Sequence, residues 1–544
     1  SQLGYAAKQP KKVVIEQDTN DTNIGEITLY RLGEDGRSKV ASGSGEPWGE
    51  FLRYRYFTWD FSEITTPGLY LLEYRGKESH AFRIGDDVFS RHAWQPTLEY
   101  YLPVQMCHMR VNEKYRVWHG LCHHDDALMS PVDTNHFDGY ISGPETLTQF
   151  EPLEHVPGLN RGGWHDAGDY DLRVESQMTT VWLLSLMVEE FGLDHDATLI
   201  DQDRQVVEIH QPDGRNDALQ QIEHGLLSVL GAYQSMGRLY RGIIVPTIRQ
   251  YILLGDGSTQ TDNRVSQNAR ETGKADDRLV FTEINPTREL NAAAGLAAAS
   301  RALRTYNPKL SRAALKAAIE IHAQAGESAD VSSRAFALAE LFLATNEPGW
   351  LETLVTMEKE LADNIGKTGW ALGRVMPHVQ NTRFRDSIAA AVEAHQADVQ
   401  RLAAATPYGV PYEPHIWGAG WGIQRFGVSQ YLFHKAWPEL ADFDVVLDAL
   451  NFVLGVHPGE NTMSFVSGVG ANSALVAYGV NRADWSFIPG GVISGTALIR
   501  PDLPELKIWP FFWQQTEYVM GGGATNYMFL ALAADAWARQ QAAE

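Results

Sequence analysis

The chain has 544 residues, of which 44% are hydrophobic and 21% are charged, and its formal net charge at pH 7 is −23. This composition is typical of a soluble globular protein, and the length predicts two domains. The acidic balance disfavours nucleic acids and anionic membrane surfaces as partners, and no run approaches the ~18 apolar residues of a membrane span.

Residues 1–88 are predicted to form a small β-sandwich of the immunoglobulin type. Short runs rich in β-branched and aromatic residues alternate there with turn-forming stretches such as residues 32–36 and 66–68. Many short strands in fewer than about a hundred residues are typical of this architecture. No cluster of acids or histidines occurs in the segment, so we expect a supporting role. The predicted strands are 13–15, 27–30, 56–61 and 69–74.

Helical patterns dominate residues 89–544. Apolar residues recur at three-to-four spacing and alanine is frequent, which favours closely packed helices in a barrel-like all-α domain. The stretches 107–176, 250–287, 406–427 and 457–524 lack this pattern, and loops longer than ~12–15 residues are usually functional. The predicted helices are 91–106, 177–191, 217–236, 288–306, 311–325, 332–344, 350–364, 387–405, 442–456 and 525–541.

Residues 162–171, Gly-Gly-Trp-His-Asp-Ala-Gly-Asp-Tyr-Asp, carry the strongest catalytic signal. Asp166 and Asp169 are three residues apart among small residues that permit a tight turn and the close approach of a ligand. Both carboxylates can therefore point at one water molecule, as a general base requires. For an isolated pair of acids, a helix cap and a surface ion pair would be the usual interpretation. The surrounding Gly, Trp and His residues favour a catalytic turn.

Cys107, Cys122, His123 and His165 have the donor types of a tetrahedral zinc site. Four protein ligands leave no open position, so such a site is structural. Because His165 adjoins Asp166, the metal would also hold the acidic turn in place. A disulfide or two buried thiols are the alternatives, and the histidines next to Cys122 favour zinc.

Glu517 is a single acid in the aromatic-rich stretch 509–518. Desolvation in such a setting raises the pKa of a carboxyl group, as a general acid near neutral pH requires. An exposed glutamate at a helix start is the alternative. Together with the acid pair, Glu517 predicts glycoside hydrolysis, in which one carboxylate activates water and another acid protonates the leaving oxygen.

Residues 162–170 resemble the water-activating motif of glycoside hydrolase family 9, which contains many cellulases. The Cys107, Cys122, His123 and His165 set resembles the zinc site of members with an N-terminal immunoglobulin-like domain, and residues 464–470 are similar to the family segment Ser-Tyr-Val-Thr-Gly-Phe-Gly.

The resemblance implies an (α/α)6 barrel behind the β-sandwich. It also implies inverting hydrolysis of β-1,4-glucosidic bonds in cellulose, related β-glucans or cello-oligosaccharides. Asp169 would be the catalytic base, Asp166 its partner in holding the water, and Glu517 the acid. We expect a secreted or periplasmic enzyme whose export signal has been removed, since the chain opens at Ser1 without Met.

Three stretches depart from the family pattern. Residues 471–478 lack the sugar-binding His-His-Arg, and Thr516-Glu517-Tyr518 replaces an Asn-Glu segment with a nearby Asp. These two changes weaken the case for an open, endo-acting cleft. Residues 332–334, Ser-Ser-Arg, stand where many members have a calcium-binding Asp-Glu pair. The resemblance is therefore not a sufficient basis for expecting a calcium site.

Aromatic and histidine side chains in the loops are the expected sugar contacts. Trp417 and Trp421 have the alternative role of filling the barrel. The runner-up activities are an exo-acting β-glucosidase or exo-β-glucosaminidase with a closed pocket. A non-catalytic glycan-binding protein is the rival from another class, although it has no need for three acids. The expected substrate contacts are Trp164, Tyr170, His415, Trp417, Trp421 and Tyr518.

Overall fold

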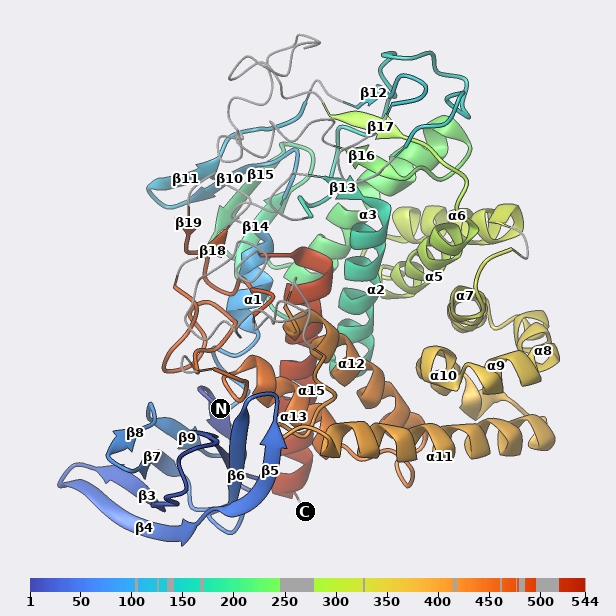
Figure 1. Ribbon diagram of the computed structural model, residues 1–544. Coiled ribbons are helices and arrows are strands. Elements are labelled where there is room, and N and C mark those ends of the chain that lie inside the picture. The colour runs from blue at the N-terminus through green and yellow to red at the C-terminus, as the bar shows by residue number, and fades with distance from the viewer. Residues whose placement is uncertain are drawn as a thin grey trace.

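The computed structural model contains a β-rich N-terminal part and a larger helical part (Figure 1). It describes all residues except 103–105, 125–126, 135–140, 167–170, 245–277, 326–327, 414–417, 460–461, 476, 479–484, 496–517 and 544. The predicted order of a β-sandwich followed by an all-α barrel is confirmed. Among the described residues, no helix combines the length and the apolar character needed to cross a membrane.

Two sheets packed face to face form the N-terminal part. The larger sheet has the order β1-β9-β7-β3-β4 with β8 added to β7, and the smaller one has the order β2-β6-β5. Ile27 of the larger sheet packs against Ile15 and Phe57 of the smaller one, and all three are buried. The strands are β1 (Gly4–Tyr5), β2 (Lys12–Asp18), β3 (Glu26–Gly33), β4 (Gly36–Ser44), β5 (Glu46–Phe51), β6 (Tyr54–Asp60), β7 (Gly68–Tyr74), β8 (Lys77–Glu78) and β9 (Phe82–Ile84).

Six helices of the second part form a closed inner ring, in which α2, α5, α7, α10, α12 and α15 each contact the next and α15 returns to α2. Outside the ring, α3, α6, α8, α11, α13 and α1 pack on α2, α5, α7, α10, α12 and α15 respectively. Six such pairs make an (α/α)6 barrel. Their bounds are α1 (Gln95–Tyr100), α2 (Val174–Phe191), α3 (Asp217–Met236), α5 (Pro286–Ala302), α6 (Pro308–Ala325), α7 (Val331–Thr345), α8 (Pro348–Thr356), α10 (Ile365–Gly373), α11 (Thr382–Ala404), α12 (Gly420–Ala436), α13 (Asp444–Val453) and α15 (Thr525–Ala543).

Small residues let the inner helices approach closely. Residues 292–299 of α5 are almost all alanine and are buried against neighbouring helices. A Cβ atom on Gly295 would lie 2.9 Å from the carbonyl oxygen of Met178 on α2. The close packing of helices that the alanine-rich pattern predicts is therefore confirmed.

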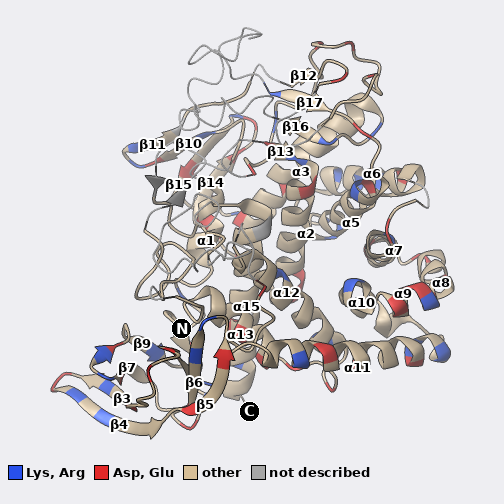
Figure 2. Ribbon diagram, viewed as in Figure 1, with Lys and Arg blue, Asp and Glu red and all other residues tan. Residues whose placement is uncertain are grey.

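Charged residues of both signs lie along helices α9 (Glu358–Asp363) and α11 (Figure 2).

Several helix bounds predicted from the sequence are wrong. The segment 91–106 contains the short helix α1 in place of one long helix, and 350–364 contains α8 and α9 with a break at Met357. α12 begins at Gly420 inside the stretch 406–427 that was expected to be a loop. Gly420 allows close packing at the start of this helix, since a Cβ atom on it would lie 2.7 Å from the carbonyl oxygen of Ser494.

Small sheets, which the sequence pattern did not reveal, lie at the end of the barrel where α2 begins (Figure 1). One has the order β11-β10-β15-β14 and another β12-β17-β16-β13. Most of their strands have two to four residues, too few for a recognisable alternation. Their bounds are β10 (Arg110–Glu113), β11 (Arg116–His119), β12 (Leu128–Met129), β13 (Leu172–Arg173), β14 (Thr198–Asp201), β15 (Val206–Ile209), β16 (Gly242–Ile244) and β17 (Leu279–Phe281).

A cavity of about 190 Å³ lies where the sandwich meets α13. Lys12 of β2 forms an ion pair of 3.5 Å with Asp448 of α13 across this junction. Burial raises the pKa of Asp448 to about 6, even though the amine of Lys12 opposes this effect.

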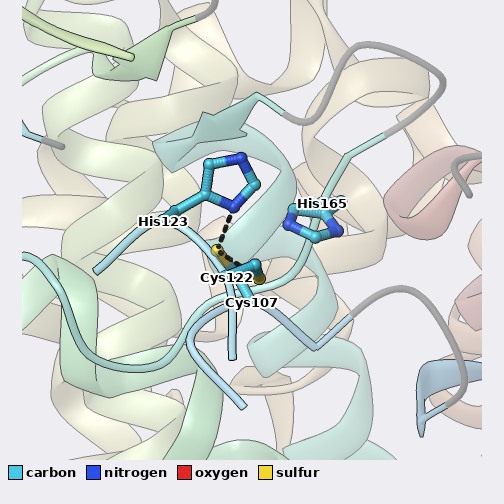
Figure 3. Close-up of side chains that lie close together, drawn as sticks. All are labelled: Cys107, Cys122, His123 and His165. Carbon is cyan, nitrogen blue, oxygen red and sulfur yellow. Dashed lines mark hydrogen bonds between the residues drawn. The ribbon is translucent and has the colours of Figure 1, made fainter. Parts of the chain in front are cut away.

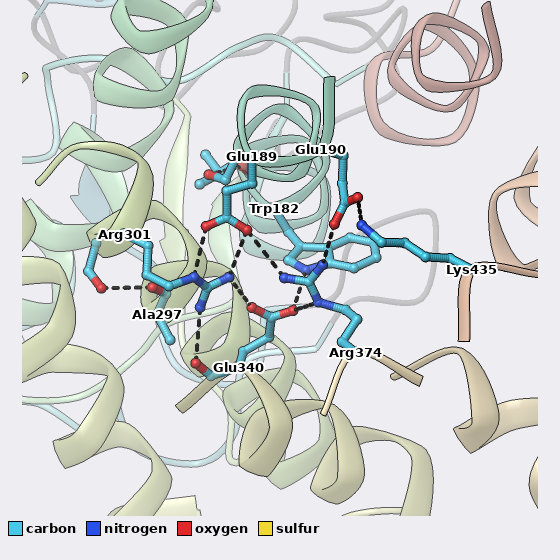
Figure 4. Close-up of polar contacts among 11 residues, drawn as sticks. Trp182, Glu189, Glu190, Ala297, Arg301, Glu340, Arg374 and Lys435 are labelled. Carbon is cyan, nitrogen blue, oxygen red and sulfur yellow. Dashed lines mark hydrogen bonds and ion pairs between the residues drawn. The ribbon is translucent and has the colours of Figure 1, made fainter. Parts of the chain in front are cut away.

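A buried ionic cluster joins inner helices at the opposite end of α2 (Figure 4). Glu340 of α7 is fully buried; its carboxylate lies 2.5 Å from Arg301 of α5 and 2.7 Å from Arg374, which follows α10. Trp182 of α2 donates an indole hydrogen bond of 3.0 Å to the same carboxylate, and both arginines also pair with Glu189. We refer to these five residues as the Glu340 cluster.

Candidate active site and metal centre

The Gly162-Gly163 pair makes the close backbone approach that its sequence predicts, but toward the protein itself. Both residues have positive φ, +69° and +84°. A Cβ atom on Gly162 would lie 2.3 Å from the carbonyl oxygen of His224, and one on Gly163 would lie 2.5 Å from Leu172. Any side chain would clash at either position, so glycine is required by both conformation and space.

Two buried histidines and a backbone amide hold the carbonyl groups of this pair. The amide of Cys107 donates to the carbonyl of Gly163 at 2.9 Å, and the same oxygen lies 2.7 Å from Nε2 of His224. Burial lowers the pKa of His224 to about 3, so the ring is neutral and donates from Nε2. Nδ1 of His108 lies 2.9 Å from the carbonyl oxygen of Gly162. The backbone before Asp166 is thereby fixed from two sides.

Asp166 is buried, and its carboxylate forms an ion pair with Arg173, the residue just before α2. Its amide donates to the carbonyl of Asp171 at 2.9 Å, which closes the loop between them. Its carbonyl accepts a 3.1 Å hydrogen bond from the amide of Met520. Because Met520 is three residues after Glu517 in the sequence, the segments that carry the predicted base and acid meet at this hydrogen bond.

The segment 464–470 joins the same site. Oγ of Ser467 lies 2.7 Å from the hydroxyl of Tyr518, and the amide of Ser467 donates to the carbonyl of Gly491 at 2.9 Å. Ile493 and Tyr518 are paired as an isolated antiparallel bridge. Three of the motif segments that the sequence singled out are thus in contact through the backbone or through hydroxyl groups.

The predicted substrate-contact residues fall into three groups. Trp164 and Tyr518 are fully buried; the indole of Trp164 donates to Gln221 at 2.8 Å, so neither ring offers a face to a sugar in this structure. Trp421 is half-buried at the start of α12, and its indole nitrogen has no partner among the described residues. The other predicted contacts, Tyr170, His415 and Trp417, lie outside the described residues. The predicted catalytic residues Asp169 and Glu517 lie outside them as well.

The four predicted zinc ligands come together in one buried cluster (Figure 3). Their ligand atoms all lie within 4.8 Å of one another. Sγ of Cys107 lies 3.9 Å from Sγ of Cys122 and 3.5 Å from Nδ1 of His123. A tetrahedral zinc ion with bonds of ~2.3 Å to sulfur and ~2.05 Å to nitrogen would place these pairs roughly 3.8 and 3.6 Å apart. The donor set therefore fits zinc.

Neither cysteine is part of a disulfide, so the disulfide alternative does not apply to this structure. A disulfide needs an S–S distance of about 2.05 Å, far below the 3.9 Å observed. Burial is the main cause that raises the pKa of the Cys107 thiol. A bound cation favours thiolates over thiols and would reverse this effect.

The metal cluster lies at the base of the hairpin β10–β11. Cys107 precedes this hairpin and Cys122 follows it. His165 attaches the acidic turn to the same point, directly before Asp166. A metal held by these residues would hold the acidic turn in place, as the sequence predicts, and would link it to this hairpin.

Residues 332–334 have other partners than a calcium ion. Asp330 caps α7 by accepting hydrogen bonds from the amide and hydroxyl of Ser333, and Arg334 pairs with Glu360 of α9. Within the described part of the chain, the Cys/His cluster is the single group of His, Cys, Asp and Glu side chains arranged to hold a metal.

Sequence reasoning missed the groups that hold the acidic turn. His108, His224 and Arg173 contact the turn, but they have no motif of their own and lie in different segments. His108 directly follows the predicted metal ligand Cys107, and this adjacency is the signal that could have found it. His224 and Arg173 offered no comparable signal.

Comparison with known proteins identifies relatives. The chain matches the profile of glycosyl hydrolase family 9 over residues 93–478. A xyloglucan-specific endo-β-1,4-glucanase of Bacteroides ovatus, BoGH9A, is 28% identical over 197 residues, which are 35% of this chain and 30% of that protein. Endoglucanase D of Acetivibrio thermocellus is 26% identical over 193 residues, 35% of this chain and 26% of that protein. The matches therefore span less than a third of these curated relatives.

Solved structures share the whole fold. A metagenome-derived glycoside hydrolase family 9 endoglucanase superposes with a TM-score of 0.73 at 18% identity, covering 98% of each chain. A family 9 protein of Bacteroides ovatus gives 0.70 at 20% identity, covering 99% of this chain and 98% of the other. A Zn-binding triple mutant of the family 9 endoglucanase J30 gives 0.70 at 18% identity, covering 97% and 99%.

Proposed function

Since the chain belongs to glycosyl hydrolase family 9 and is a glycoside hydrolase, we propose that it cleaves β-1,4-glucosidic bonds in cellulose, related β-glucans or cello-oligosaccharides. The named relatives are endoglucanases, and one is described as xyloglucan-specific. The observation that carries the proposal is the hydrogen bond from Met520 to Asp166, which brings the segments of the predicted base and acid together.

The proposed reaction uses three acids in separate roles. Asp169 takes a proton from water, Asp166 orients that water, and Glu517 protonates the leaving oxygen. The ion pair with Arg173 supports the role of Asp166, because a carboxylate held on one side by a guanidinium keeps a fixed orientation. Attack by water opposite the leaving group inverts the configuration at the anomeric carbon.

Zinc is the proposed metal of Cys107, Cys122, His123 and His165. With four protein ligands it supplies no reactive position and acts as a cross-link. The protein also links the metal site to the acidic turn directly, because the amide of Cys107 donates a hydrogen bond to the carbonyl of Gly163. The two regions therefore share a rigid backbone contact. We do not propose a calcium site.

The substrate is proposed to be a neutral glucan in preference to an amino sugar. Asp171, which as an exposed acid would suit a cationic sugar, is fully buried. Tyr170, His415, Trp417 and Trp421 remain the proposed sugar contacts, and Trp164 and Tyr518 are proposed to support them from within. An exo-acting β-glucosidase with a closed pocket is the second candidate, because residues 471–478 lack the His-His-Arg of endo-acting members. We expect the enzyme to act outside the cytoplasm.

The test combines substrates and variants. Wild-type protein is incubated with carboxymethyl-cellulose, xyloglucan and reduced cello-oligosaccharides, and products are followed by chromatography and by NMR of the anomeric proton. We expect mixed oligosaccharides of inverted configuration. Asp169→Asn and Glu517→Gln should each lose about 10²–10⁴-fold in turnover, whereas Asp363→Asn, on the exposed helix α9, should not. Glucose alone from the start would indicate the exo-acting candidate, and no cleavage by the wild type would indicate a glycan-binding protein.

A further inference from the structure

Arg278 is a fully buried arginine beside the metal cluster. It directly precedes β17, and its Nη2 lies 3.2 Å from Sγ of Cys107. Burial of a guanidinium is unfavourable unless its charge and its N–H groups are matched. The contact with sulfur is one of the interactions that match these N–H groups in the interior.

The chemistry of the contact favours a metal-bound thiolate as the acceptor. A neutral thiol is a weak acceptor, whereas a thiolate makes a charge-assisted hydrogen bond with a guanidinium. Two thiolates and two neutral imidazoles on Zn²⁺ are neutral as a set, and the N–H of a guanidinium draws electron density from the sulfur that accepts its hydrogen bond. Hydrogen bonds of this kind from outside the ligand set orient the ligands and tune the metal.

Arg278 also connects the cluster to the acidic turn by a second route. The strand that follows it, β17, pairs with β16, which pairs with β13. β13 ends at Arg173, the partner of Asp166. The carbonyl of Arg278 accepts a hydrogen bond of 3.2 Å from the amide of Ala127, close after the ligand His123. The sheet is thus linked through β17 to the proposed metal site and through β13 to the ion pair.

We propose that Arg278 is a positioning residue of the metal centre, whose hydrogen bond to the thiolate of Cys107 retains the metal and sets the donor strength of that sulfur. This role rests on the zinc site proposed above. It assigns Arg278 no contact with substrate.

Cobalt substitution tests the proposal, because Co²⁺ bound to thiolates absorbs in the near ultraviolet by charge transfer from sulfur. The full-length protein is loaded with Co²⁺ or Zn²⁺ as wild type, Arg278→Met and Arg278→Lys. We expect the charge-transfer band to move to lower energy in both variants, since the sulfur becomes a stronger donor, and chelator-driven zinc release to be about 10–100-fold faster. Arg288→Lys is the control, because Arg288 is also buried but pairs with the carboxylates of Glu175 and Glu283.

The outcomes separate the two proposals. A band position and a release rate equal to wild type in Arg278→Lys, with tight metal binding retained, overturn the role of Arg278 and leave the zinc site intact. A wild-type protein that binds neither Zn²⁺ nor Co²⁺ overturns the zinc site itself. If Arg278→Met does not fold, Arg278→Lys decides alone, since it keeps the charge and changes the hydrogen-bond geometry. A purely structural role would lower stability in metal-free and metal-loaded protein alike and leave the band unmoved.

Discussion

Replacing Glu340 with glutamine is the sharpest test of what holds the barrel together. The change keeps the shape of the side chain but removes its charge, so Arg301 and Arg374 lose the carboxylate that lies between them (Figure 4). Glu340 is fully buried and the arginine side chains are 12% and 7% exposed, so water cannot replace the lost interaction well.

Two independent arguments give the size of the effect. Breaking a buried ion pair by removing one partner typically costs about 3–5 kcal/mol. Burial by itself raises the pKa of Glu340, but Arg374 and Arg301 outweigh burial and lower it to about 2, from an ordinary value of 4.5. At about 1.4 kcal/mol per unit, this difference corresponds to about 3 kcal/mol at neutral pH. We therefore expect Glu340→Gln to lower the free energy of unfolding by about 3 kcal/mol.

The pH dependence follows from the direction of the shift. Because the pKa of Glu340 is lower in the folded state, its contribution is present above the unfolded pKa near 4.5 and is lost as the pH falls toward 2. The difference between wild type and Glu340→Gln should be largest at pH 7 and should shrink below pH 4.5. Urea unfolding followed by tryptophan fluorescence at pH 7, 5 and 3 measures it.

Glu360→Gln is the matched control, because Glu360 also pairs with an arginine, Arg334, but its side chain is 46% exposed. An exposed pair contributes about 0–1 kcal/mol. If Glu340→Gln is no less stable than Glu360→Gln at pH 7, the reasoning about the Glu340 cluster is wrong.

Three other variants test separate parts of the structure. Gly163→Ala should lose at least about 100-fold in activity, because its φ of +84° and the clash with Leu172 displace the acidic turn; circular dichroism checks that the fold survives. Asp448→Asn should be more stable than wild type at pH 8, by at most about 3 kcal/mol. Burial raises the pKa of Asp448 to about 6, so its favourable contribution at low pH is lost as the pH rises through 6; equal melting temperatures at pH 8 would contradict this. Cys122→Ser should bind less than one equivalent of zinc and melt at a lower temperature, whereas wild type with unchanged melting after chelation would argue against a structural metal.

The fold could be predicted largely from the sequence because its two parts have different periodicities. Alternating strands with turns mark the sandwich, and alanine-rich helical repeats mark the barrel. The errors have physical causes: α12 begins at Gly420, which permits close contact with Ser494, and the β-strands of the barrel loops are too short to show a pattern. Such elements are fixed by tertiary contacts and leave little local signal.

The site was predictable to the extent that its chemistry is concentrated in motifs. The four predicted metal ligands were identified by residue type, and the structure brings their side chains together. The supporting groups were not predictable, because His224, Arg173 and Arg278 belong to no motif and their contacts with the site form only when the chain folds. Such contacts depend on the three-dimensional packing, which residue spacing does not encode.

Helix α2 has a different group of charges at each end: one at the proposed active site and one that we expect to stabilise the barrel. Its first residue follows Arg173, the partner of Asp166, while Glu189 near its last turn belongs to the Glu340 cluster. An α-helix of 18 residues is about 27 Å long, so the two groups of charges interact weakly through the protein. Mutations more than about 10 Å apart usually have additive effects. We therefore expect Glu340→Gln to retain wild-type turnover at temperatures where it is folded. A fall in turnover without unfolding would mean that α2 transmits strain from the ionic cluster to the acidic turn.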